Sequence, residues 1–190
     1  EVGEVAVDTE TSSLDPHQAD LIGVSLSSKI GKACYIPLGH KSQKNLNKEL
    51  VLKKLKPLLE DSSIKKIGQN IKFDFIVLFK HGITISTMED TMLMSYVLDA
   101  GKNRHNMDSL SEIHLNHKTI AFKDLVGTGK KEINFKDVDV EKAKDYAAED
   151  ADITFRLYKK FHKSLKDEKM VNIYELFEKP MIKILAFMEI

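Results

Sequence analysis

The stretch VAVDTETSSLD, residues 5–15, carries a short apolar run directly into two carboxylates. Side chains alternate between the faces of a strand, so Ala6, Asp8 and Glu10 share one face of the strand that this run predicts. Two like charges placed this close on one face repel each other. A divalent cation is the strongest agent that could offset the repulsion. The stretch therefore predicts a buried strand with a charged site at its end.

The composition narrows the class of protein. The 190 residues are enough for one domain with a proper core, and the apolar share of 42% and charged share of 31% are ordinary for a globular chain. The 29 basic and 29 acidic residues cancel, which argues against a domain that coats duplex DNA by bulk charge. A local nucleic-acid site stays possible.

The sequence also indicates where in the cell the protein is located. It contains no apolar run long enough to span a bilayer and no signal-peptide pattern, so no membrane partner is expected. Its single cysteine, Cys34, cannot form an internal disulfide, which favours a cytoplasmic location. Cys34 lies in an apolar run and is expected to be buried. Because the chain begins without methionine and stops inside an apolar helical pattern, we expect a domain of a longer protein.

Hydrophobic periodicity divides the rest of the chain into strands first and helices after. Strands are expected at 4–10, 21–27 and 33–38, with antiparallel hairpins between them and a short strand and turn at 64–70. Helices are expected at 47–61, 71–82, 88–99, 107–116, 139–169 and 180–190, and a polar loop at 118–138. The order predicts an α/β domain with a mixed sheet and helices on its faces.

Two later segments also combine polar groups at helical spacing. Asn70 and Asp74 are four residues apart in GQNIKFD, and Tyr146 and Asp150 are four apart in DYAAEDAD, so each pair shares a helix face. Taken singly, each has an ordinary explanation: Asn70 as a helix N-cap, and the acids of 145–152 as a solvated face. The combination of the three segments is what indicates a site.

The segments VDTETSSLD, IGQNIKFDF and YAAEDAD resemble the three motifs of the 3′–5′ proofreading exonuclease domain of bacterial DNA polymerase I. DTMLMSYVLDAGKNRHNMDSLSE, HKTIAF and FEKPMIKILAFMEI are similar to the same family, so the resemblance covers nearly the whole chain. It implies a ribonuclease-H-like fold, with a mixed five-stranded sheet whose first three strands are antiparallel. It also implies an exonuclease domain over 1–175 and, over 176–190, the start of a helix that leads into a covalently linked polymerase domain.

The resemblance implies a role for each polar residue of the three motifs. Two divalent cations, Mg²⁺ or Mn²⁺, would be held by four carboxylates: Asp8, Glu10 and Asp150 for the first, and Asp8 with Asp74 for the second. A donor set of oxygens without histidine or cysteine suits these cations and not zinc. Tyr146 would orient the attacking water, because a phenol with a pKa of about 10 is a poor base at neutral pH.

The resemblance also assigns contacts with the 3′-terminal nucleotides of single-stranded DNA. They fall on Thr9, Leu14, Gln69, Asn70, Phe73, Arg104 and Phe122. Leu14 would wedge between the last two bases, Phe122 would stack on a base, and Arg104 would hold a phosphate. Phe73 departs from the family pattern, in which tyrosine is common. Without the family, Leu14 and Phe122 are equally well explained as packing residues.

The expected activity is 3′–5′ hydrolysis of single-stranded or frayed DNA ends to deoxynucleoside monophosphates, in proofreading for a polymerase. Two alternatives remain open from the sequence: an RNA exonuclease of the ribonuclease D type, which shares the acids and the tyrosine, and a binding or structural module without catalysis. The seven histidines lack metal-ligand spacing and are expected on the surface or in loops.

Overall fold

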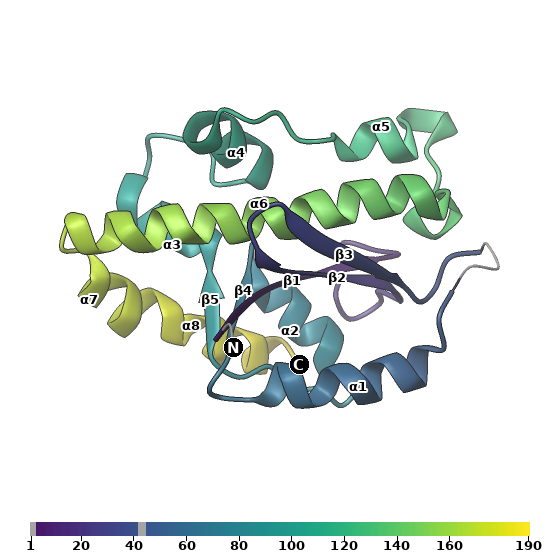
Figure 1. Cartoon of the computed structure of the whole chain (residues 1–190), viewed down its shortest axis with the longest axis horizontal. Helices are drawn as coiled ribbons and strands as arrows, with labels where there is room; N and C mark the ends of the chain where they lie inside the picture. The colour runs from purple at the N-terminus through teal and green to yellow at the C-terminus, as the bar shows by residue number, and fades with distance from the viewer. Residues whose placement is uncertain (1–2, 42–44) are drawn as a thin grey trace.

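A five-stranded mixed sheet runs through the middle of the protein in the computed structural model, which describes residues 3–41 and 45–190 (Figure 1). β1 (Glu4–Thr11) pairs antiparallel with β2 (Leu21–Lys29), and β2 pairs antiparallel with β3 (Lys32–Pro37). On its other side β1 pairs parallel with β4 (Lys65–Gly68), and β4 with β5 (Met88–Asp90). The order β3-β2-β1-β4-β5 confirms the expected fold class and makes β1 the central strand.

Helices cover both faces of the sheet (Figure 1). α6 (Val140–Asp167) crosses one face with α3 (Thr91–Asp99) and α4 (Met107–Leu115) beside it, whereas α1 (Lys48–Glu60), α2 (Ile71–Phe79) and α8 (Lys179–Glu189) cover the other. The remaining elements are short: α5 (Phe122–Val126), α7 (Val171–Ile173), the 3₁₀ turns Gly129–Lys131 and Phe135–Asp137, and a π-helical turn Tyr174–Glu178. No helix in the described part of the chain is long and apolar enough to cross a membrane.

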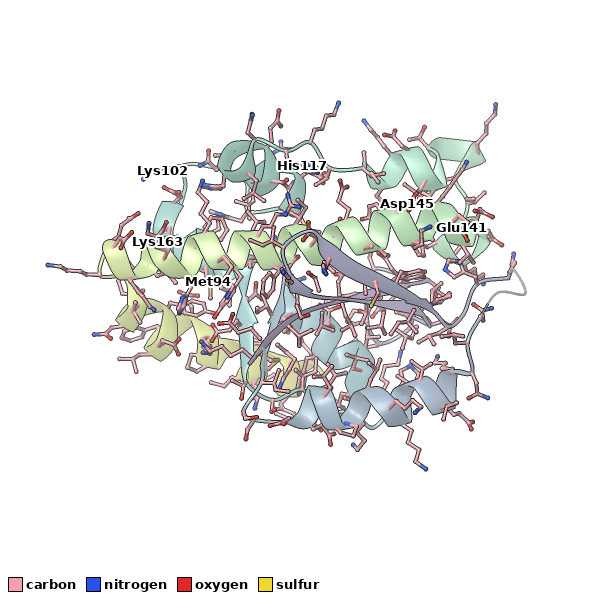
Figure 2. All side chains as sticks on the ribbon, viewed as in Figure 1. Met94, Lys102, His117, Glu141, Asp145 and Lys163 are labelled. Atoms are coloured by element: carbon pink, nitrogen blue, oxygen red, sulfur yellow. The ribbon has the colours of Figure 1, made fainter. Side chains whose placement is uncertain are left out.

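The alternation along β1 decides which layer each side chain enters. Val5 and Val7 pack into the apolar layer under α1, α2 and α8, whereas Ala6 packs with Met94 under α6. Figure 2 shows Met94 on the sheet side of α6. By the same alternation Asp8 and Glu10 point toward α6, and Thr9 points toward α2. The carboxylates of Asp8 and Glu10 therefore lie on the α6 side of the sheet, at the edge of the apolar layer.

Most of the expected elements are confirmed to within a few residues. α1 begins after Asn47, whose side chain accepts a hydrogen bond from the Leu50 amide at 2.9 Å. Such an N-cap satisfies one of the free amides at the start of a helix. α6 is one helix of 28 residues, close to the expected 139–169. The last helix begins earlier than 180, because helical structure starts at Val171.

Three expectations are wrong. Residues 88–90 form β5 instead of the first turn of a helix, because a strand of three residues leaves no periodicity to read. The 118–138 region is not a plain loop: it folds into α5 and two 3₁₀ turns that bury Val126, Phe135 and Val138. Cys34 is exposed, because β3 is an edge strand and its outer positions have no covering layer.

Candidate active site

The carboxylates of β1 meet α6 at the end of the strand. Oxygen atoms of Asp8, Glu10 and Asp150 all lie within 4.8 Å of one another, and among the described residues these three form the group whose geometry could hold a metal ion. Glu10 and Asp150 are buried, and Asp8 is half-buried. Their donor set is purely carboxylate oxygen, which suits a hard divalent cation.

Asp74 approaches the same strand end from α2. Its Oδ1 accepts hydrogen bonds from the Thr9 amide at 2.9 Å and from the Thr9 hydroxyl at 2.6 Å. α2 can begin directly after β4 because Gly68 has no side chain: a Cβ there would lie 2.7 Å from the Cβ of Ile71. Thr9 thus fixes the fourth carboxylate beside Asp8 without itself facing α6.

Burial and mutual repulsion disfavour the ionised forms of these acids. Burial raises the pKa of Asp8 to about 6. Burial, and then the charges of Asp8, Asp150 and Asp74, raise the pKa of Glu10 well above its ordinary value. The pKa of Asp150 and that of Asp74 also rise well above the ordinary value, first by burial and then by the charge of Asp8. Glu10 Oε1 is buried without a hydrogen-bond partner. A cation bound here would remove the repulsion and satisfy this oxygen.

Tyr146 lies one turn before Asp150 on α6, and their side chains are hydrogen-bonded. Burial, and then the charges of Asp150 and Glu10, raise the pKa of the Tyr146 hydroxyl. The phenol is therefore a poor base at neutral pH. When it donates to Asp150, its oxygen keeps lone pairs that can accept a hydrogen bond from a water.

A cavity of about 740 Å³ opens over the carboxylates. Of the residues predicted to bind the nucleotide, the structure brings six to its wall: Thr9, Leu14, Gln69, Asn70, Phe73 and Phe122. Arg104 is the exception, because it lies exposed on the connection between α3 and α4 and does not line the cavity. Leu14 is 95% exposed, so packing does not account for it.

The two polar side chains of the turn at 68–70, Gln69 and Asn70, differ in whether their amides are already hydrogen-bonded. Gln69 donates from Nε2 to the His105 carbonyl at 2.7 Å and accepts from the Thr91 hydroxyl at 2.5 Å, so both ends of its amide are occupied. Asn70 has a left-handed backbone with φ of 62° and makes no side-chain cap hydrogen bond. Asn70 thus occupies the N-cap position of α2, as its ordinary explanation expects, but its side chain does not cap the helix. The side-chain amide is therefore free to reach into the cavity that Asn70 lines.

Apart from Phe122, the part of the cavity wall that the 118–138 region contributes is not predicted by the sequence. Phe135 is buried, with its ring centroid 6.1 Å from the parallel Phe122 ring and 6.1 Å from the Tyr146 ring. His40 packs on the Phe135 ring and is itself buried. It lies in the loop after β3, so the expectation that histidines lie on the surface or in loops holds for its loop position but not for its exposure. The signal was present in the apolar residues of FKDLV and INF, but their spacing is too irregular for a single period.

The family model and the curated relatives agree on one family. A family model described as 3′–5′ exonuclease matches residues 1–166. DNA polymerase I of Rhizobium leguminosarum is 42% identical over 208 residues, an alignment that covers 98% of this chain and 20% of that protein. The chain spans about a fifth of the length of the curated relatives that it matches.

Solved structures share the fold. Brucella melitensis NrnC with bound Mg²⁺ is similar with a TM-score of 0.74 and 26% identity, and the match covers 100% of this chain and 84% of that one. Escherichia coli RNase D, an exoribonuclease involved in structured RNA processing, is similar with a TM-score of 0.73 and 15% identity, over 97% of this chain and 45% of that one. At 15% identity the second likeness concerns the fold alone.

Proposed function

The chain belongs to the 3′–5′ exonuclease family found in bacterial DNA polymerase I, and from this premise we propose that it removes nucleotides from the 3′ end of single-stranded or frayed DNA by two-metal-ion hydrolysis. The products are deoxynucleoside monophosphates, and the role is proofreading in a bacterial cytoplasm. The observation that carries the proposal is the group of Asp8, Glu10 and Asp150, two of them buried and one half-buried, which have no cationic partner among the described residues.

The residues fit a pair of Mg²⁺ or Mn²⁺ ions. Asp8, Glu10 and Asp150 would hold one ion, and Asp8 with Asp74 the other. Bound cations of this kind lower the pKa of a water and stabilise the charge of both attacking and leaving oxygens in phosphodiester hydrolysis. The Mg²⁺ bound by the structurally similar Brucella melitensis NrnC supports this choice of cation.

Two side chains, Tyr146 and Thr9, orient the attacking water and one of the metal-binding carboxylates. Tyr146 keeps its proton, donates to Asp150 and accepts from the attacking water, which holds the water in line with the phosphorus atom. Thr9 holds Asp74 by two hydrogen bonds, so this carboxylate loses little rotational entropy when it becomes a ligand.

Single-stranded ends fit the exposed apolar side chains of the cavity. Leu14 is 95% exposed and Phe122 is 44% exposed, so both present apolar surface to an entering base. Base stacking on an aromatic ring is worth about 1–3 kcal/mol and tolerates any sequence. A mispaired end frays more readily than a paired one, so the substrate itself supplies the preference for errors. Arg104 lies outside the cavity and would contact a phosphate of the strand that leads into it.

The degree of similarity favours DNA as the substrate. Identity to DNA polymerase I is 42% over nearly the whole chain, against 15% for RNase D, whose likeness concerns the fold alone. The intact set of four acids and a tyrosine argues against a module without catalysis.

The C-terminal helices support a linked polymerase domain. The relatives are about five times longer than the chain, and residues 176–190 would begin the connection to a polymerase domain. The outward side of this segment is strongly apolar: Leu176 and Phe177 are each 67% exposed and Met188 is 77% exposed. Exposed apolar side chains gathered on one segment are typical of an interface with another domain. Met188→Glu should lower the melting temperature of the full-length parent and leave that of the isolated domain unchanged.

The experiment that tests the activity follows a 5′-labelled single-stranded DNA with Mg²⁺, Mn²⁺ or EDTA, next to an RNA of the same sequence. The expected result is a metal-dependent ladder that shortens from the 3′ end of the DNA and is lost in Asp8→Ala. Asp145→Ala is the matched control, because Asp145 is an exposed acid of α6 outside the cluster. The absence of any ladder, from the domain and from its full-length parent, would refute the proposal.

A further inference from the structure

The segment between α4 and α5 is fastened to α6 by one carboxylate. Glu149 accepts a hydrogen bond from the Ile120 amide on its Oε2 at 2.6 Å, and its Oε1 lies 2.8 Å from His117 Nε2. Figure 2 shows His117 and Asp145 on the side of α6 that faces this segment. Glu149 precedes Asp150 directly, and consecutive helix residues point about 100° apart. Glu149 therefore faces the segment while Asp150 faces β1.

A second pair of contacts fastens the same segment to α4. The Thr119 hydroxyl donates to Asp108 at 2.6 Å, and the Ser111 hydroxyl donates to the His117 carbonyl at 2.8 Å. The path of residues 117–120 is thus fixed from two helices, although the segment has no regular structure of its own. The ordinary explanation of the acids in 145–152, a solvated helix face, does not account for Glu149, because a solvated acid would not hold a backbone amide and a histidine ring of another segment.

The segment leads directly to the aromatic wall of the cavity. Phe122 follows Ile120 by two residues and is the first residue of α5. Its ring lies parallel to Phe135, with a 7° angle between the planes, and its centroid is 6.0 Å from that of Tyr146. The free face of Phe122 lines the cavity.

We propose that Glu149 is a positioning residue: by holding the amide of Ile120 and the ring of His117, it sets Phe122 beside Tyr146 as the platform for a base of the substrate. The inference rests on the proposed function and adds a residue that touches neither metal nor water. Loss of the Glu149 acceptor frees the segment on its α6 side, so the Phe122 ring becomes mobile before substrate binds. Binding then has to order it, and the affinity for single strands falls.

The first test reads the position of residue 122 without any substrate. The chain contains no tryptophan, so Phe122→Trp introduces a single fluorescent reporter at a half-exposed site. With Glu149→Ala added, we expect lower fluorescence anisotropy and a red-shifted emission in a protein that still unfolds cooperatively. Glu149→Gln keeps an oxygen acceptor for Ile120 and should restore most of the signal. Unchanged anisotropy and emission in Glu149→Ala would overturn the inference, whether or not the protein is a nuclease.

The second test measures kinetics on single-stranded DNA. Glu149→Ala should raise KM about tenfold with kcat nearly constant, the size expected for a lost hydrogen bond to a charged group. Asp145→Ala removes an acid one turn away on α6. Asp145 pairs with Lys144 and has no hydrogen bond or ion pair with the described residues of the segment, so this variant should leave both constants unchanged. In the Phe122→Ala background, Glu149→Ala should have little further effect, because both changes remove the same platform. An additive double variant, or a fall in kcat with an altered Mg²⁺ requirement, would overturn the inference; an inactive wild type would instead refute the proposed function.

Discussion

Two strand ends of the sheet carry buried acids, and they differ in what surrounds those acids. At the end of β5, Glu89 and Asp90 are each 2% exposed. Glu89 accepts from Lys179 Nζ at 2.7 Å and from the Tyr174 hydroxyl at 3.0 Å. At the end of β1, Asp8 and Glu10 face Asp150, so three acids meet without a cation among the described residues.

Asp90 has a particularly complete set of donors. Its carboxylate accepts from the amides of Asn70 at 3.1 Å, Ile71 at 3.0 Å and Met92 at 2.9 Å. These amides begin two different helices, α2 and α3, so one side chain caps both. By fixing the start of α2, Asp90 also fixes the helix that carries Asp74.

The pKa alone does not separate the two kinds of acid. Burial raises the pKa of Asp90 to about 6 and that of Asp8 to about 6 as well. The two acids differ in their partners. Hydrogen bonds from backbone amides offset part of the cost of burying Asp90, whereas Asp8 has a charge that adds to the repulsion on Glu10 and Asp150. A buried acid with partners stabilises the fold, and a buried acid without them marks the site.

The largest expected effect is on activity, at β1. Asp8→Asn should reduce the rate of DNA hydrolysis at least about 10³-fold, because a lost metal ligand removes several kcal/mol of transition-state stabilisation. In EDTA the same variant should melt at the wild-type temperature or higher, because one repelling charge is gone. Activity comes from a DNA ladder assay and stability from thermal unfolding followed by circular dichroism. A marked drop in melting temperature would contradict this prediction and show that Asp8, like Asp90, stabilises the fold.

The second effect is on stability, at β5. Asp90→Ala leaves several buried amides without an acceptor, and we expect a loss of about 3 kcal/mol or more. For a chain of this size that corresponds to a fall in melting temperature of roughly 6–12 °C. Asp145→Ala, at an exposed position, should shift it by less than about 2 °C. If Asp90→Ala melts like the wild type, the proposed division between the two strand ends is incorrect.

The third effect depends on pH and metal. The pKa of Asp8 and that of Asp90 are raised on folding, so between about pH 4 and pH 6 the folded protein binds more protons than the unfolded chain. The melting temperature of the metal-free protein should therefore fall as the pH rises through this window. At pH 7, millimolar Mg²⁺ should restore it by about 2–4 °C for each kcal/mol of binding free energy. In Asp8→Asn, Mg²⁺ should no longer raise the melting temperature, whereas the part of the pH dependence that comes from Asp90 should remain.

The sequence predicted the site better than it predicted the supports of the site. Asp8, Glu10 and Asp74 could be singled out because three segments with acids among apolar residues occur together and resemble the motifs of one family. Glu89 and Asp90 are more deeply buried than Asp8, but the sequence MEDTM does not indicate this, since it is compatible with the first turn of a helix. Their importance depends on Lys179, which is 90 residues away, and on amides of another helix. Partners so distant in the chain leave no local pattern.

The secondary structure shows the same contrast between elements that the local sequence predicts and elements that distant contacts decide. Long elements such as α6 were predicted within a few residues, because a 28-residue helix repeats its apolar period many times. The 118–138 region was expected to be a loop, and its helical turns are fixed by tertiary contacts such as Phe135 with Phe122 and Tyr146. Exposure of Cys34 likewise depends on the position of β3 at the edge of the sheet, which one strand's sequence does not record.

The smallest expected effect compares two apolar residues of the cavity rim. Leu14→Ala and Phe122→Ala should each raise KM for single-stranded DNA about tenfold, which corresponds to about 1.4 kcal/mol and lies within the range for a stacking contact. Leu14 is 95% exposed, so its variant should melt at the wild-type temperature, whereas Phe122→Ala also loses the Phe135 contact and should melt slightly lower. If both variants keep the wild-type KM and rate, neither residue contacts the substrate, and the exposure of Leu14 has another cause. If only Phe122→Ala changes KM, the aromatic wall alone grips the end of the strand.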